Sequence, residues 1–349
     1  MAPPLYLTRH HNLTPMAAGF IQTVRGPVDP ATAGPTLMHE HVTSLVVPGW
    51  VDDAQHDAQA ELASRALEKW GLTGGNVVVD LTTIEGMAAA PRDVVKMARI
   101  SDDSGIQIVA ASAFYKDPFL PDWVVAAELD ELAELHAREA TEGVDGTDIR
   151  VGIFGEVGSG LHVITPNEEK CLRAIARAHR ATGVPISTHC SLGTMALEQL
   201  DIFEEEGADL SKVVLGHLDL NTRDDYLDAV LARGVTIGFD TWGKESFDYV
   251  VPGSEGQGEG AFVKWTFQRA DEERLRALIR LLKRGMEKQV VLSMDITGPE
   301  LFSNAETIGQ YGYAFIHEKV LPGLIAAGVR ESALEVMLHD NPARILTIG

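Results

Sequence analysis

The chain alternates short apolar runs with longer segments in which apolar residues recur at helical spacing. Eight of the runs have the length of a strand, and most of the segments between them end near a glycine. This repeated order is typical of βα units and predicts a parallel sheet covered by helices. The predicted strands are residues 36–39, 77–80, 106–111, 151–156, 184–189, 213–217, 235–240 and 290–295.

The segments with helical spacing of apolar residues lie between these strands, and this order predicts a single barrel. Eight βα units in 349 residues predict an α/β chain folded as a (β/α)8 TIM barrel, a fold that commonly exceeds 200 residues as a single domain. A short hairpin is expected at residues 17–24 and Gly26-Pro27, after an N-terminal arm at residues 1–16. The predicted barrel domain therefore spans residues 17–349. Its predicted helices are residues 54–70, 123–142, 167–182, 195–206, 224–233 and 272–286.

The amino-acid composition of the chain limits the classes of partner that we expect. The net charge of −22 argues against nucleic acid and anionic membrane surfaces, so a small-molecule substrate is expected. The only cysteines, Cys171 and Cys190, form no spaced cluster, which indicates a reducing compartment. No basic leader with an apolar core begins the chain, and no run approaches the ~20 apolar residues of a membrane span. We therefore expect a cytoplasmic protein.

Residues that commonly bind metals stand where predicted strands end. The ends of parallel barrel strands meet at one mouth, where barrel enzymes have their active sites. Four imidazoles and two carboxylates are more than one catalytic zinc usually needs, so the pattern predicts two divalent metal ions and a hydrolase that attacks with a metal-bridging hydroxide. Zinc is the expected metal, with manganese and cobalt as alternatives. The residues are His39, His41, Glu156, His189, His217 and Asp295.

Each of these residues also has a structural interpretation, because a single histidine at a strand end more often forms a hydrogen bond than binds a metal. Glu40 alternates to the opposite strand face from its neighbours and is expected to make a structural contact. Asp80 and Asp240 are expected to form hydrogen bonds behind the ligands, although a direct role stays open. Cys190 is interpreted as a packing residue.

Five motifs in order resemble the phosphotriesterase-related family of the amidohydrolase superfamily, from about Gly19 to Pro342. They are TLMHEH at 36–41, FGEVG at 154–158, GVPISTH at 183–189, VLGHLD at 214–219 and LSMD at 292–295.

The resemblance implies a ligand assignment. His39, His41 and Asp295 would hold the more buried metal, His189 and His217 the more exposed one, and Glu156 would bridge them. In phosphotriesterases proper that bridge is a carboxylated lysine, whereas this chain has Glu156. The chain therefore looks closer to the phosphotriesterase homology proteins and their animal relatives, which also carry glutamate there. The resemblance also implies a homodimer.

The resemblance extends to the reaction and the substrate. Asp295 would accept the proton of the nucleophile, and Tyr115 aligns with a tyrosine beside the metals of related lactonases. Lys244 and Trp242, after the seventh strand, are predicted to contact the substrate, with Lys244 facing an anionic group. Phosphotriesterases proper have Asp-His where this chain has Asp240-Thr241, which argues against efficient organophosphate hydrolysis.

Hydrolysis of a lactone or carboxylic ester is the leading hypothesis for function. Hydrolysis of an N-acyl amide is the alternative, with phosphotriester hydrolysis below it. A barrel that binds a ligand without turnover is a third class, disfavoured by the complete ligand set. Residues 253–260 are a candidate lid.

Overall fold

Eight parallel strands occupy the centre of the molecule. The structure is a computed structural model that describes residues 19–43, 53–85, 91–244, 269–296 and 312–349. One sheet has the order β3-β4-β5, and the other has the order β10-β9-β8-β7-β6. The strands are β3 (Thr36–Glu40), β4 (Val77–Asp80), β5 (Gln107–Ala110), β6 (Phe154–Ser159), β7 (Ile186–Cys190), β8 (Val213–Gly216), β9 (Thr236–Phe239) and β10 (Val290–Leu292).

Backbone hydrogen bonds cross both seams between the sheets. Between β5 and β6, the N–H of Gly152 donates to the carbonyl of Ala110 at 2.9 Å. Between β10 and β3, the N–H of Asp295 donates to the carbonyl of His39 at 3.0 Å. Strand pairing itself is not continuous around the ring, so the barrel is not closed by ladders alone. The order of eight parallel strands nevertheless confirms the predicted α/β fold of the TIM-barrel class.

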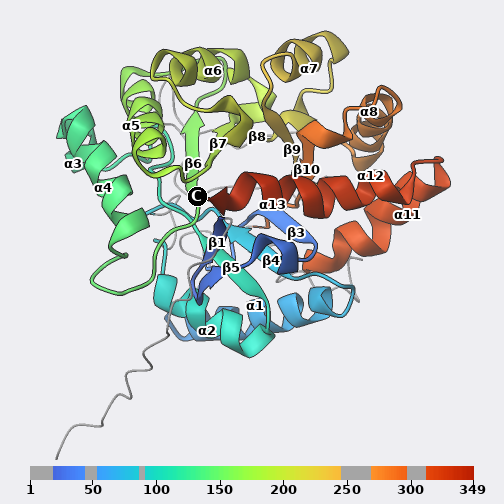
Figure 1. Ribbon diagram of the computed structural model, residues 1–349, viewed down its shortest axis with the longest axis horizontal. Helices are drawn as coiled ribbons and strands as arrows, with labels where there is room; N and C mark the ends of the chain where they lie inside the picture. Colours follow the sequence, from blue (N-terminus) through green and yellow to red (C-terminus); the bar gives the residue numbers. More distant parts are fainter. Residues whose placement is uncertain (1–18, 44–52, 86–90, 245–268, 297–311) are drawn as a thin grey trace, which may run out of the picture.

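Helices surround these strands (Figure 1). They are α1 (Asp53–Gly71), α2 (Val94–Ser104), α3 (Asp122–Ala126), α4 (Leu129–Thr141), α5 (Pro166–Thr182), α6 (Ala196–Glu205), α7 (Asp224–Leu231), α8 (Asp271–Lys283), α11 (Leu321–Ala326), α12 (Glu331–Glu335) and α13 (Asn341–Leu346). The predicted helix at 123–142 is wrong as one element. Ala127 and Glu128 are extended, and a capping box between Glu128 and Glu131 starts α4 as a separate helix.

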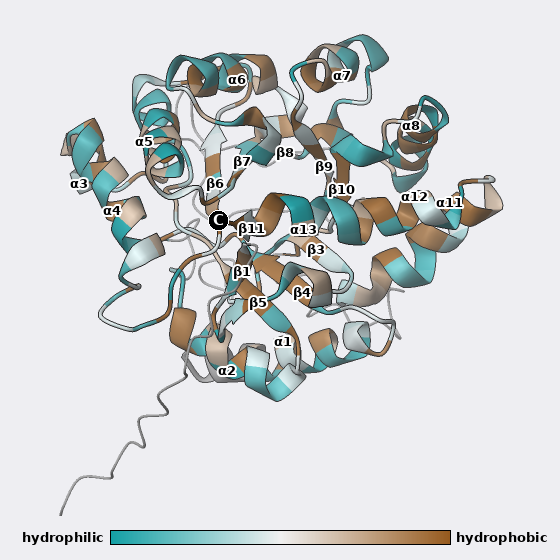
Figure 2. Ribbon diagram, in the orientation of Figure 1, coloured by the Kyte–Doolittle hydropathy of each residue, from teal (hydrophilic) through white to brown (hydrophobic). Residues whose placement is uncertain are grey.

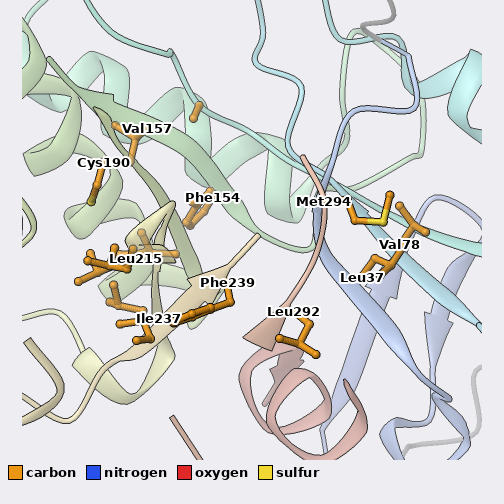
Figure 3. Close-up of a cluster of buried hydrophobic side chains, with 14 of the residues drawn as sticks. Leu37, Val78, Phe154, Val157, Cys190, Leu215, Ile237, Phe239, Leu292 and Met294 are labelled. Carbon is orange, nitrogen blue, oxygen red and sulfur yellow. The ribbon is translucent and has the colours of Figure 1, made fainter. Parts of the chain in front are cut away.

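Alternation along the strands divides the core in two. Leu37 and Val78 belong to the larger cluster, which includes residues of most of the surrounding helices, whereas their neighbours Met38, Val77 and Val79 belong to a smaller cluster made mostly of strand residues and the end of α13. Figure 3 shows part of the larger cluster. Figure 2 shows hydrophobic residues along the central strands and mixed hydropathy along the helices. This division explains why the strands are apolar on both faces.

The start of the strands is covered by the two ends of the described chain. β1 (Phe20–Thr23) and β2 (Gly26–Val28) form the predicted antiparallel hairpin. β11 (Thr347–Ile348), which was not predicted, pairs with β1. The N–H of Val24 donates to the carbonyl of Ile108, near the start of β5, at 2.8 Å. The opposite ends of the strands are therefore the ones that carry the candidate site.

Some expectations fall outside the described ranges. The N-terminal arm at 1–16 and the candidate lid at 253–260 both lie there. Within the part of the chain that the structure describes, no helix combines the length and apolar character needed to cross a membrane.

Candidate metal centre

The six predicted ligands converge at one end of the strands, although not all at strand ends. His39 and His189 lie inside β3 and β7, and His217 directly follows β8. The predicted position of Glu156 at the end of its strand is corrected. β6 begins at Phe154 and continues to Ser159, which places Glu156 within the strand. His217 and Asp295 have positive φ values of 61° and 50°. Such values are uncommon outside glycine, and they turn both side chains out of the regular strand path.

The carboxylate of Glu156 has its two oxygens facing different histidines. Oε1 lies 3.4 Å from Nε2 of His41. Oε2 lies 3.4 Å from Nε2 of His39, 3.0 Å from Nδ1 of His189 and 3.6 Å from Nε2 of His217. Glu156 therefore contacts all four imidazoles from the middle of the cluster.

Asp295 lies on the side of the cluster formed by β3. Its Oδ1 is 3.1 Å from Nε2 of His41 and 3.8 Å from Nε2 of His39. Its Oδ2 accepts a short hydrogen bond from Nζ of Lys244, a side chain that is almost fully buried. The predicted proton acceptor therefore has an ammonium group as a direct neighbour.

His189 is at the more open side. Its Nδ1 is 2.9 Å from Nε2 of His217, and the hydroxyl of Tyr115 lies 3.2 Å from both nitrogens of the His189 ring. Ser191 Oγ lies 3.1 Å from Nε2 of His189. The structure thus brings Tyr115 beside the ligand set, as predicted.

Charges within the cluster shift several pKa values in opposite directions. Burial alone would lower the pKa of His39 and His217, but the negative Asp240 and Glu156 outweigh it, so the pKa of His39 lies well above its usual value and that of His217 is raised to about 9. Burial dominates at His189 and lowers its pKa to about 3 despite Glu156.

The two carboxyl ligands are held ionised. Burial opposes ionisation of Glu156, but contacts with His189, His217 and His39 keep its pKa well below its usual range. The pKa of Asp295 is also well below its usual range, because Lys244 and His41 offset the effect of burial. The site therefore presents anionic oxygens, which suit divalent cations.

Trp242 lies apart from this cluster. Its ring is packed in the hydrophobic core, with the guanidinium of Arg274 5.7 Å from the ring centroid and Phe239 beside it. Its predicted contact with substrate stays a prediction. Lys244, two residues later, does reach the site through Asp295.

Sequence reasoning missed several residues around the ligands. The hydroxyl of Thr82 lies 3.3 Å from Nδ1 of His41, and Ser191 contacts His189. Lys116 is buried with its ammonium group 5.3 Å from the ring centroid of Tyr115. All three follow a strand of the barrel within a few residues, so their position after the strands was the available signal.

The donor set fits metal ions. Nε2 of His39 and Nε2 of His41 are buried and form no hydrogen bond, as expected of nitrogens that would bind a cation. Within the described ranges, two groups have ligand atoms within 4.8 Å of one another: His39, His41 and Asp295, and His39, Glu156 and His217. The first group is the predicted set for the buried metal. The second has His39 where His189 was predicted.

Comparisons with known proteins agree with this picture. The Phosphotriesterase family matches residues 19–346. A phosphotriesterase homology protein of Escherichia coli is 36% identical over 313 residues, which cover 89% of this chain and 97% of the relative. An N-acetyltaurine hydrolase of Tetraodon nigroviridis is 29% identical over 362 residues, covering 95% and 98%. The crystal structure of a lactonase from Listeria monocytogenes has a TM-score of 0.78 at 28% identity, covering 95% of this chain and 99% of that one.

The fold and the converging ligands define a metal-dependent hydrolase with a barrel of the TIM class. The chain belongs to the phosphotriesterase family, which confirms the resemblance carried by its five motifs.

Proposed function

We propose that the chain hydrolyses a small lactone or carboxylic ester with two divalent metal ions, and that these ions are zinc. The observation that carries the proposal is the position of Glu156, whose two oxygens face different ligands. Oε1 faces His41 on the side of Asp295, while Oε2 faces His189 and His217 and also lies beside His39. A carboxylate in this position suits a bridge between two cations.

The ligands would divide between two positions. His39, His41 and Asp295 would hold one ion, and His189 and His217 the other, with Glu156 shared. Two cations bound there would lower the pKa of a shared water toward neutrality and polarise the scissile carbonyl.

The remaining steps belong to residues of the chain. Asp295 accepts the proton of the attacking water and delivers it to the leaving group. The Lys244 ammonium keeps the pKa of Asp295 low, so the carboxylate is ionised before the water attacks. The Tyr115 hydroxyl, next to His189, orients the oxygen of the substrate. Lys244 also supplies positive charge for an anionic group on the substrate.

Hydrolysis of an N-acyl amide is the second candidate. It is supported by relatives named N-acetyltaurine hydrolase that align with 95% of this chain. Cleavage of an amide requires a proton for the departing amine, and Asp295 is placed to supply one. Positive charge at Lys244 would favour acyl substrates that carry an acid group.

Metal analysis combined with a substrate screen tests the proposal. We expect about two metal ions per wild-type chain and metal-dependent turnover of lactones, esters or N-acyl amino acids, with phosphotriesters poor. Glu156→Ala should lose metal and most of the rate. Glu168→Ala is the matched control, because Glu168 is also a buried glutamate but caps α5. Full activity and two ions in Glu156→Ala would contradict the bridge.

The homodimer implied by the family resemblance is a further proposal. Light scattering at several protein concentrations would test it, and a stable monomer would contradict it.

A further inference from the structure

We propose that Asp240 is a positioning residue that holds one histidine of each metal position and thereby couples the binding of the two metals. This inference rests on the proposed function, because it assumes that His39 and His217 bind different ions. Asp240 directly follows β9 and is almost fully buried.

The two oxygens of Asp240 serve different histidines. Oδ2 lies 3.1 Å from Nδ1 of His39. Oδ1 lies 2.9 Å from Nδ1 of His217 and accepts the backbone N–H of the same residue at 2.8 Å. An ionised carboxylate only accepts hydrogen bonds, so His217 presents Nδ1–H to Asp240 and leaves Nε2 to face the site. Nδ1 of His39 faces Oδ2 at ion-pair distance, without the alignment of a hydrogen bond, and its Nε2 also faces the site.

Asp240 also spans the barrel. His39 belongs to β3, in the three-stranded sheet, whereas His217 follows β8, in the five-stranded sheet. One carboxylate therefore fixes the distance between two ligands that come from different sheets. Two other described neighbours that are not themselves predicted ligands each lie beside one ring: Thr82 beside His41, and Ser191 beside His189.

Glycines leave the room that this carboxylate occupies. A Cβ added at Gly238 would lie 2.3 Å from Oδ2 of Asp240, with no other atom closer than Asp240 Cγ at 2.9 Å. A Cβ added at Gly216 would meet the carbonyl oxygen of Thr188 first, at 2.3 Å, and would lie 3.3 Å from Oδ2 of Asp240 and 3.3 Å from Cε1 of His39. Alanine at 238 would thus displace the Asp240 carboxylate without changing the charge of the site.

Zinc titration of metal-free protein tests the coupling, with calorimetry to resolve the two binding events. Loss of a group that orients a ligand histidine commonly weakens metal binding by about 10–100-fold. We expect losses of this size at both positions in Asp240→Asn and again in Gly238→Ala. Asp219→Asn is the matched control, because Asp219 is a buried carboxylate nearby that accepts hydrogen bonds from Thr241. It should retain both affinities.

The outcomes separate this inference from the proposed function. If the wild-type protein binds no zinc, the proposed function fails. If the wild type binds two ions and either Asp240→Asn or Gly238→Ala binds both as tightly, only the inference is overturned. Loss at a single position would disprove the coupling, and equal loss in Asp219→Asn would assign the effect to general destabilisation. Cobalt absorption spectra that change in both Asp240→Asn and Gly238→Ala, but not in Asp219→Asn, would support it.

Discussion

The two sides of the ligand cluster are held in different ways. On the β3 side, the side chains of His39 and His41 are 2% and 0% exposed, and Asp240 and Thr82 fix the outer nitrogens of their rings. On the other side, the His189 side chain is 14% exposed, and its neighbours Tyr115 and Ser191 are neutral hydroxyls. Asp295 on the β3 side is also 14% exposed and His217 on the other side only 5%, so the contrast lies between the buried histidines His39 and His41 and the single ligand His189.

Glu40 strengthens the buried side without contacting a metal ligand side chain. Its carboxylate accepts hydrogen bonds from the hydroxyl of Ser293 at 2.7 Å and from the backbone N–H groups of Met294 and Ile296 at 2.8 and 2.9 Å. These bonds join the end of β10 to β3 on either side of Asp295. The structural contact expected for Glu40 is therefore found, and it positions the proton acceptor.

The largest effect should come from removing the charge of Asp295. Asp295→Asn should lower kcat by about 10²–10⁴-fold, because the amide cannot accept the proton of the attacking water. Steady-state kinetics on the substrate found in the screen would measure it. Glu139→Gln is the control. Glu139 lies on α4, away from the site, and it also pairs with a buried cation, Arg92. An Asp295→Asn rate near wild type would remove Asp295 from the reaction.

A pH series compares the two histidines of the open side. In metal-free protein the pKa of His217 is raised to about 9 and that of His189 is lowered to about 3. His217 and His39, whose pKa is also raised, must each lose a proton before Nε2 can bind a cation, so zinc affinity should rise from pH 7 to 9 by up to about tenfold per pH unit for each histidine that is still protonated. His189 is already neutral over this range and adds no pH dependence to the zinc affinity.

Competition against a chromophoric chelator at pH 7, 8 and 9 would measure this dependence. His217→Ala should remove the slope that is due to this residue. A wild-type affinity that is the same at all three pH values would show that His217 and His39 are both neutral in the metal-free protein.

Glu40→Gln should loosen the buried side specifically. The substitution replaces one carboxylate oxygen, which now accepts a hydrogen bond, with an NH2 group that can only donate. The buried donor that faced this oxygen would lose its acceptor, which costs about 1–3 kcal/mol. We expect the free energy of unfolding in denaturant to fall by that amount. Zinc should be lost first from the position that includes Asp295. Glu168→Gln provides the comparison at another buried glutamate, and it should lose stability while its zinc affinity stays at the wild-type value.

The smallest effect is expected on the open side. Tyr115→Phe keeps the ring but removes the hydroxyl beside His189, so kcat should fall about fivefold, as for one net hydrogen bond of about 1 kcal/mol, with metal content unchanged. Elemental analysis together with kinetics would check both parts. A large loss of metal in this variant would show that the two sides do not differ as described.

The sequence predicted the fold better than the boundaries of its elements. Eight apolar runs are eight strands, because both faces of a parallel sheet covered by helices are apolar. The start of β6 was placed three residues too early, since Val151 and Ile153 are as apolar as the strand itself. α2 and the helices after residue 320 were not predicted. The extended residues 127–128 that separate α3 from α4 interrupt helical spacing too briefly to be seen in the pattern.

By itself, the sequence determined the order of strands and helices, the family and the set of metal-binding residue types, because alternation and local motifs depend on neighbours along the chain. Only the tertiary structure decided which atoms meet. It placed Asp240 between His39 and His217, joined Lys244 to Asp295, and packed Trp242 in the core. These contacts join residues that are far apart in the chain. Their geometry depends on barrel curvature and on the space left by Gly238, which no local pattern records.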